Sequence, residues 1–393
     1  MDPRQYSSTN PKIYLSLAAL GLATISVFWR RLLEFADWPI RLACDRYDLG
    51  VYFRSSRWAA GEGTLYQDVA SEYPPFANLL YGLCRLVSER LPGFEEPRLA
   101  FDVVWISMGW VAFVFASYLV LNRAAISKTA CLMWLAPPTL YFSLYRFDIY
   151  PALATILAFL ALKNCRFRWA SLWIGLAIAW KGYCLFLLPS LLVYVLVKKG
   201  WRNALDCCLL CLAPFLLGNL VVYCYAGWNG MLSPYLFHAD RNLNGQSTFD
   251  GLFLENLILA APSLPKALQI LCSLAPALAR PDTFQRLVDA SLISLVGFVS
   301  FSVFYSPQFC LWIVAVALFS ERKPTIILAT LFSWLSYLYF PLAFDLAHPN
   351  LEEPFFRAVI TVLSVLRLAI LGSATRSLLS PTPDCNSSAT PQS

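Results

Sequence analysis

Long apolar tracts alternate with short polar connectors along most of this chain. A helix that crosses a bilayer needs about 20 mainly apolar residues, and several tracts are shorter, so the connectors help to count the crossings. The tracts lie near residues 12–29, 99–121, 129–145, 149–163, 168–180, 182–197, 203–225, 252–276, 287–305, 308–320, 324–341 and 356–374. This pattern predicts an all-α integral membrane protein.

Four short connectors between the tracts are basic, and such connectors mark the cytoplasmic side of a membrane protein. If all four face the cytoplasm, an even number of crossings separates each pair. Residues 129–163 and 168–197 then hold two crossings each, and 203–320 hold four. The scheme predicts about twelve transmembrane helices with both termini inside. The connectors are "NRAAISK" (122–128), "KNCRFR" (163–168), "KKGWR" (198–202) and "ERK" (321–323).

Residues 30–98 become a long first extracytoplasmic loop in this scheme. The segment 74–91 within it is too short to cross and carries three charged residues, so we expect an interfacial helix that lies along the membrane. Arg30 and Arg31, directly after the first span, run against the positive-inside rule. Residues 1–379 are expected to form a single transmembrane domain, and residues 380–393 a disordered cytoplasmic tail.

Composition agrees with the membrane class and excludes other functions. Hydrophobic residues make up 58% of the chain and charged residues 14%, whereas soluble domains have about 25% charged residues. The net charge of +6 is interpreted as an orientation signal, because no basic patch interleaved with aromatic residues indicates nucleic-acid binding. The 12 cysteines do not have zinc-binding spacing. We therefore expect neither a metal nor a cofactor.

Chemically varied polar residues gather on the predicted outer face, whereas the inner connectors contribute only charge. Lys181 carries the strongest single signal, because it interrupts the apolar tract 168–197 and an ionisable group at membrane depth is usually functional. The set comprises Asp48, Tyr52, Arg54, Tyr66, Asp68, Glu72, Tyr73, Arg146, Asp148, Lys181, His238, Asp240, Arg241, Gln246, Ser247, Tyr305 and Gln308.

Cations and carboxylates at a lipid boundary favour one type of chemistry. Fixed cations suit a phosphate whose lipid tail lies in the bilayer, and a nearby carboxylate suits a general base. Together they favour transfer of a sugar from a polyprenyl phosphate, with the departing phosphate stabilised by the cations. Two alternatives are a transporter or flippase of lipid-linked sugars and an inactive scaffold subunit. Transporters are often built from repeated halves, and no such repeat is visible here.

The stretch "DLGVYFRSSRWAAGEGTLYQ" (48–67), followed by "EYPPF" (72–76), resembles the first-loop signature of glycosyltransferase family 87. Four later segments resemble motifs of that family in the same order, and the resemblance covers roughly residues 12 to 345. The first mannosyltransferase of GPI-anchor assembly is more distantly similar. The segments are "LAPPTLYFSLYRFDIYPAL" (135–153), "AWKGYCLFLLP" (179–189), "FHADRNLNGQS" (237–247) and "SPQFCLWIVA" (306–315).

The resemblance implies a GT-C fold, a polyprenyl-phosphate-mannose donor and an inverting reaction. It also implies that Asp48 is the catalytic base and that His238 and Arg241 bind the donor phosphate. Two departures from the family pattern concern the acceptor and the sugar more than the reaction class. Asn-Gly-Gln-Ser (244–247) stands where the family often has Gln-x-Glu-Ser, and "FCLWIVA" (309–315) lacks the usual final proline.

The complete prediction assigns further residues to the substrates. Lys181 and Arg146 are expected to join His238 and Arg241 at the donor phosphate. The expected partners are a polyprenyl-phosphate-linked sugar, a glycolipid or polysaccharide acceptor, and membrane lipid. The site is expected on the outer face of the inner (plasma) membrane, with the endoplasmic reticulum membrane as the alternative. The residues expected at the sugar or acceptor are Tyr52, Glu72, Tyr73, Asp148, Gln246 and Gln308.

Overall fold

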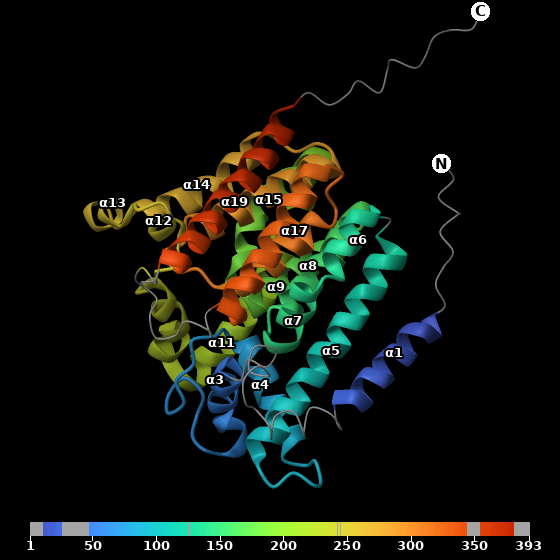
Figure 1. The fold of residues 1–393 in the computed structure, drawn as a ribbon, viewed down its shortest axis with the longest axis vertical. Helices are drawn as coiled ribbons and strands as arrows, with labels where there is room; N and C mark the ends of the chain where they lie inside the picture. Colours follow the sequence, from blue (N-terminus) through green and yellow to red (C-terminus); the bar gives the residue numbers. More distant parts are fainter. Residues whose placement is uncertain are drawn as a thin grey trace, which may run out of the picture.

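The computed structural model describes residues 11–25, 47–124, 126–241, 243, 245–343 and 354–380. These residues form a helical bundle (Figure 1), which confirms the all-α class, and an isolated bridge joins Leu65 and Val69. The elements are α1 (Pro11–Thr24), α3 (Tyr47–Ser55), η4 (Arg57–Ala60), α4 (Pro75–Ser88), α5 (Pro97–Arg123), α6 (Lys128–Trp134), α7 (Pro137–Tyr145), α8 (Ile149–Lys163), α9 (Phe167–Trp180), η5 (Gly182–Leu187), α10 (Leu188–Lys199), α11 (Trp201–Ala239), α12 (Thr248–Gly251), α13 (Glu255–Ala260), α14 (Leu264–Leu278), α15 (Phe284–Ser300), η6 (Pro307–Phe309), α16 (Cys310–Ala317), α17 (Lys323–Tyr337), η7 (Leu338–Ala343) and α19 (Pro354–Leu379).

Several helices have the length and composition of membrane spans. Within the described ranges, 5 helices qualify, and the number is 6 if α7 and α8, which meet at a bend of 118°, form one span. The five are Pro97–Arg123, Gly182–Lys199, Trp201–Ala239, Lys323–Pro341 and Phe356–Leu379. Long apolar helices of this kind indicate a multi-pass membrane protein. Helix length alone accounts for fewer crossings than the twelve predicted, which stay a prediction.

Breaks in the backbone divide the longer apolar tracts. Helix α9 ends at Lys181, where the backbone is extended with φ −157° and ψ 123°. Helix α11 bends at Gly227, whose φ of 67° lies in the left-handed region that glycine adopts without steric cost. Three residues, 146–148, separate α7 from α8. Each break frees polar groups from the regular helix, and two of them contribute to the site described below.

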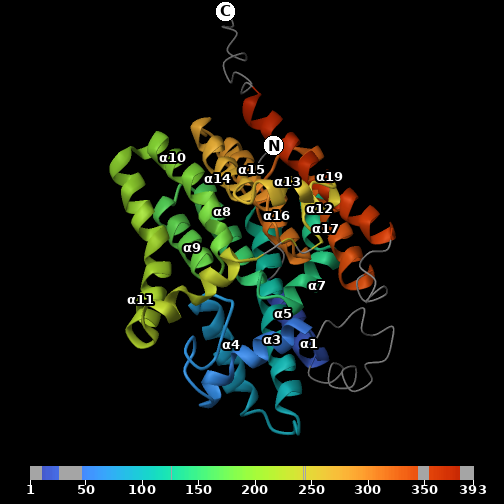
Figure 2. The ribbon, with the colours of Figure 1, turned by 90° about the vertical axis from the view of Figure 1, so that its left-hand side faces the viewer.

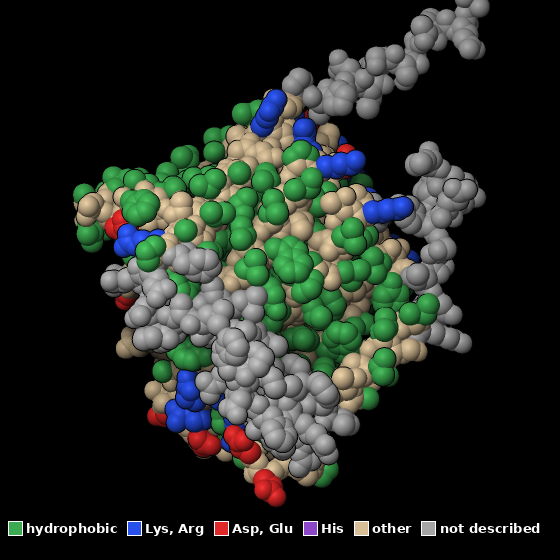
Figure 3. All heavy atoms as spheres, in the orientation of Figure 1, with side chains coloured by type: hydrophobic (Ala, Val, Ile, Leu, Met, Phe, Trp, Pro, Cys, Tyr) green, Lys and Arg blue, Asp and Glu red, His purple; other side chains and the backbone are tan. Residues whose placement is uncertain are grey.

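The surface has the apolar middle expected of a membrane protein. Hydrophobic side chains cover the middle of the face in Figure 3, whereas Lys and Arg side chains stand at its upper right edge and charges of both signs at its lower end. Helix α11 exposes a continuous series of large apolar residues, including Leu209, Leu216 and Leu220. Such a large exposed apolar area is rare in soluble monomers and fits contact with lipid.

The four basic connectors lie at one end of the bundle. Lys163 Nζ donates a hydrogen bond to the carbonyl oxygen of Ala124 at 2.8 Å, and the Lys199 ammonium lies 5.9 Å from the Phe167 ring centroid. These contacts join the first three connectors. Phe159 and Phe319 stack with centroids 5.5 Å apart, which places the end of α16 beside the end of α8. The four connectors therefore lie at the same end of the bundle, as the predicted topology requires.

Residues 47–96 form the opposite end of the bundle. Figures 1 and 2 both place α3 and α4 at the end opposite the C-terminal end of α19. Aromatic packing holds α3 there: the Tyr52 ring lies 4.8 Å from that of Tyr81 and 4.6 Å from that of Trp105, centroid to centroid. Gln67 Nε2 also donates to the carbonyl oxygen of Tyr225 at 2.8 Å. The segment before α5 is thus firmly attached to the helical bundle.

Helix α4 exposes an apolar stripe. Leu79, Leu83, Leu86 and Val87 are exposed, and their spacing places them on one side of a helix. The opposite side packs on α3, η4 and α5. An exposed apolar stripe suits a helix that lies on a membrane surface, although this placement stays a prediction. Residues 30–46 of the predicted first loop, Arg30 and Arg31 among them, and tail residues 381–393 lie outside the described residues.

Candidate active site

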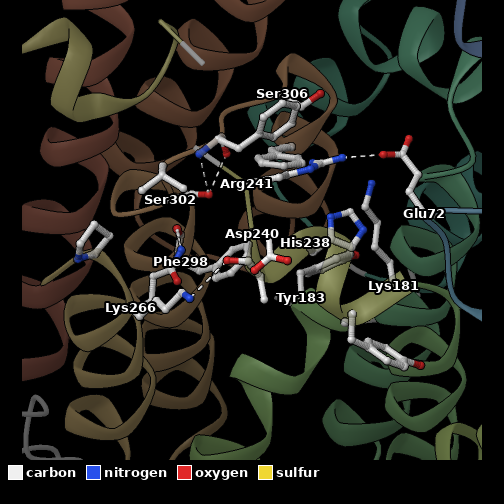
Figure 4. Close-up of a pocket in the computed structure, with 18 of the residues that line it drawn as sticks. Glu72, Lys181, Tyr183, His238, Asp240, Arg241, Lys266, Phe298, Ser302 and Ser306 are labelled. Atoms are coloured by element: carbon white, nitrogen blue, oxygen red, sulfur yellow. Dashed lines mark hydrogen bonds and ion pairs between the residues drawn. The ribbon is translucent and has the colours of Figure 1, made fainter. Parts of the chain in front are cut away.

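A cavity of about 1160 Å³ opens between the first-loop region and the bundle. Its walls come from α3, residues 72–74, η5, the end of α11, α13, α14 and the segment 302–312. These segments are far apart in the sequence, and they meet at the end of the bundle that carries α3 and α4. Ten lining residues are labelled in Figure 4, several of them charged.

Asp48 lies in the first turn of α3, and this turn forms part of the cavity wall. The carboxylate forms an ion pair with the guanidinium of Arg146, which ends α7. The Asp48 side chain is 19% exposed and lines the cavity, whereas that of Arg146 is 4% exposed and does not. The predicted base is therefore accessible, and the predicted phosphate ligand Arg146 holds it from behind.

Lys181 enters the site through the break between α9 and η5. Its ammonium donates to Asp148 Oδ1 at 2.8 Å and lies 4.5 Å from the Phe147 ring centroid and 5.0 Å from that of Trp312. Aromatic faces attract a cation at this range. Lys181, which interrupts the apolar tract 168–197 in the sequence, is therefore a cation held at the cavity wall.

Arg241 joins two walls of the cavity. Its guanidinium donates to Glu72 Oε2 at 2.7 Å and lies 4.1 Å from the Phe304 ring centroid. Figure 4 shows His238 and Lys181 side by side, with Arg241 extending toward Glu72. Burial, together with the nearby Glu72 carboxylate, raises the pKa of the Tyr73 phenol well above its ordinary value, so Tyr73 stays neutral. The basic side chains of Lys181, His238 and Arg241 therefore converge on one part of the cavity.

The family model for glycosyltransferase family 87 matches residues 72–307. The chain belongs to glycosyltransferase family 87. As a family 87 glycosyltransferase it is expected to act on a sugar donor and an acceptor. No curated protein and no solved structure matches it. The matched range contains Lys181, His238 and Arg241, whereas Asp48 precedes it.

The cavity of this glycosyltransferase contains most, but not all, of the predicted site residues. Glu72, Tyr73 and Gln308 line it together with Asp48 and the three convergent side chains. Gln308 Oε1 accepts a hydrogen bond from Ser306 Oγ at 2.5 Å. Tyr52 and Asp148 are fully buried behind the wall, and Gln246 does not line the cavity.

Several lining residues were not predicted from the sequence. Tyr183, Phe309 and Trp312 form an aromatic wall, in which the Tyr183 and Trp312 rings stack at 3.9 Å between centroids and 6° between planes. Lys266 lies farther along the cavity, as does Asp240, which belongs to the polar set predicted for the outer face. The signal for Tyr183 and Trp312 was present, because both fall in family-like segments, "AWKGY" and "SPQFCLW".

The charged residues of this glycosyltransferase form ion pairs around the cavity. In the part of the chain that the structure describes, no group of three or more His, Cys, Asp or Glu side chains could hold a metal ion. The carboxylates near the cavity instead face nitrogen cations, as in the pairs of Asp48 with Arg146 and Glu72 with Arg241. This arrangement suits recognition of an anion by side chains.

Proposed function

We propose that this family 87 enzyme transfers a sugar, mannose, from a polyprenyl phosphate to a hydroxyl group of a glycolipid or polysaccharide acceptor. The observation that carries the proposal is one cavity that contains an accessible carboxylate, Asp48, and the convergent side chains of Lys181, His238 and Arg241. A general base and a phosphate-binding set are the two parts that such a transfer needs.

The reaction follows from these positions. Asp48 accepts the proton of the acceptor hydroxyl while that oxygen attacks the anomeric carbon of the donor sugar. The bond between that carbon and the phosphate oxygen breaks, and the polyprenyl phosphate leaves with the bond's electron pair. Lys181 and Arg241 neutralise the charge that develops on the phosphate, and the His238 imidazole donates a hydrogen bond to it. Attack opposite the leaving group inverts the anomeric configuration.

The neighbouring residues prepare the walls for this reaction. Glu72 holds Arg241 at 2.7 Å, so the guanidinium is oriented before the donor arrives, and such preorganisation lowers the cost of binding charge. Tyr183, Trp312 and Phe309 stack on one another at the cavity wall, and the outer members of the stack, Tyr183 and Phe309, add apolar surface that suits a sugar ring. Gln308 and Tyr73 supply polar groups beside them that are suited to sugar hydroxyls.

The proposal includes a membrane orientation and a fold. The basic connectors would face the cytoplasm, which places the cavity on the outer face of the plasma membrane. We propose a single GT-C domain over residues 1–379 with about twelve crossings and α4 at the interface. The shared end of the four connectors and the opposite position of α3 and α4 support this arrangement. Family membership leaves the transporter interpretation without support.

Transfer by the purified protein in detergent tests the proposed function. We expect labelled mannose to move from polyprenyl phosphate mannose to a lipid or glycan acceptor extracted from the source membranes. No sealed membrane is present, so a flippase cannot produce this signal. Parallel reactions with a nucleotide-linked mannose donor serve as the control, because they should yield no product. Transfer from the nucleotide donor, and none from the polyprenyl donor, would contradict the proposal.

A further inference from the structure

Asp148 is in contact with two lining residues of the cavity without lining it. Its side chain is 0% exposed, and Oδ1 accepts hydrogen bonds from Lys181 Nζ at 2.8 Å and from Trp312 Nε1 at 2.6 Å. Lys181 and Trp312 both line the cavity. The other carboxylate oxygen, Oδ2, is buried and has no hydrogen-bond partner among the described residues. Lys181 is therefore the cation that compensates the buried carboxylate.

Three distant segments meet at this carboxylate. Asp148 belongs to the 118° bend between α7 and α8, Lys181 to the break between α9 and η5, and Trp312 to α16. A lysine ammonium sits on a flexible four-carbon chain, so it points in one direction only when its surroundings hold it. Here the Asp148 bond and the rings of Phe147 and Trp312 hold it.

We infer that Asp148 is a positioning residue, which acts on the donor phosphate through Lys181 and Trp312 and does not contact sugar or acceptor. The inference rests on the proposed function, because it assigns a phosphate to Lys181. Fixing the ammonium before binding removes an ordering cost from the binding step. A buried ammonium without a counter-ion sheds its proton or turns away. Removing the Asp148 charge also removes its repulsion of the phosphate, but we expect the loss of the oriented Lys181 cation to be the larger effect.

The test measures binding of radiolabelled undecaprenyl monophosphate to the purified full-length protein in detergent. The variants are Asp148→Asn, Lys181→Met and the double variant. We expect each single change to weaken binding about tenfold, and the double variant to bind no more weakly than Lys181→Met alone. Non-additivity is expected because Asp148 acts through Lys181. In transfer assays, Asp148→Asn should raise the KM for the donor and leave the KM for the acceptor unchanged.

Asp289→Asn is the matched control. Asp289 is also a buried carboxylate with two side-chain donors, Ser377 Oγ and Gln285 Nε2, but neither it nor these donors line the cavity. We expect its loss to lower thermal stability without weakening binding of the lipid phosphate. A general effect of removing a buried charge would instead appear in both variants.

Each outcome decides the inference. Normal binding by Asp148→Asn, additive losses in the double variant, or a raised KM for the acceptor alone would overturn it. Failure of the wild-type protein to bind undecaprenyl monophosphate would overturn the proposed function as well. If Asp148→Asn does not accumulate, Asp148→Glu replaces it, because the longer side chain retains the charge and displaces the carboxylate from Lys181. Weakened binding is again expected only while Lys181 is present.

Discussion

At the residue scale, three carboxylates at or behind the cavity wall are each paired with a cation from another segment. Ion pairs of this kind contribute little net stability compared with apolar replacements, but breaking one is costly, because it leaves a charge without its partner. These pairs matter for the geometry of the site, since each joins two segments that are distant in the sequence. The pairs are Asp48–Arg146, Glu72–Arg241 and Asp148–Lys181.

Asp48→Asn is expected to lower the rate of sugar transfer about 10²–10⁴-fold. An amide cannot accept the proton of the acceptor hydroxyl, but its carbonyl oxygen can still accept a hydrogen bond from Arg146. The protein should therefore stay folded and abundant. The measurement is transfer of labelled mannose by membranes that carry equal amounts of each variant.

Glu89→Gln is the control for Asp48→Asn. Glu89 accepts a hydrogen bond from Arg85 Nε at 2.6 Å in the same first-loop region, and it does not line the cavity. Its substitution removes an ion pair and should leave the transfer rate unchanged. A normal rate in Asp48→Asn, or an equal loss in both variants, would contradict the role of Asp48 as base.

At the element scale, α9 and α11 position two of the groups assigned to the phosphate. Helix α9 ends next to Lys181, and His238 lies in the last turn of α11. The two helices pack closely at Gly175, where an added Cβ would lie 2.7 Å from the carbonyl oxygens of Leu210 and Cys211. A side chain at this position would force the helices apart.

Gly175→Ala is expected to destabilise the protein by about 1–3 kcal/mol, the usual cost of overpacking. The measurements are the thermal unfolding midpoint in detergent and the transfer rate, and both should fall. Gly372→Ala, in α19, is the control. A Cβ added at Gly372 would meet no atom within 4 Å, and alanine favours a helix more than glycine does. A lower midpoint for Gly372→Ala than for Gly175→Ala would contradict the packing explanation.

At the scale of the whole molecule, the two ends of the bundle differ in chemistry. One end carries the four basic connectors, and the other carries α3, α4 and the cavity. From the positive-inside rule, we expect the connector end to face the cytoplasm. Cys165 is an exposed thiol in one of these connectors, and Glu95 is an exposed residue just before α5. These two positions allow the orientation to be measured.

A membrane-impermeant maleimide added to intact cells is expected to label Glu95→Cys and not Cys165. Cys165 should react only after the membrane is permeabilised. Mass spectrometry of labelled peptides distinguishes these sites from the other cysteines, and the transfer rate of Glu95→Cys shows that the variant is native. Labelling of Cys165 in intact cells, with Glu95→Cys protected, would reverse the orientation; labelling of both from one side would contradict the separation of the two ends.

The sequence by itself determined the class of the protein and the breaks that form the site. Apolar tracts require helices in lipid, because an unpaired backbone group is costly there. Lys181 and the turn at 146–148 stood out because they interrupt such tracts, and both are near the cavity. The motif order indicated family 87, which the match over residues 72–307 confirms.

Only the tertiary structure decided which polar residues share the cavity. Tyr52 and Asp148 were expected at the substrate, but both are fully buried, because helices remote in sequence pack over them. Trp312 entered the site for the same reason, through its bond to Asp148 across 164 positions. Hydropathy and spacing along one chain specify which residues are polar and where helices end. They do not specify which helix faces which, because that depends on side-chain packing between distant segments.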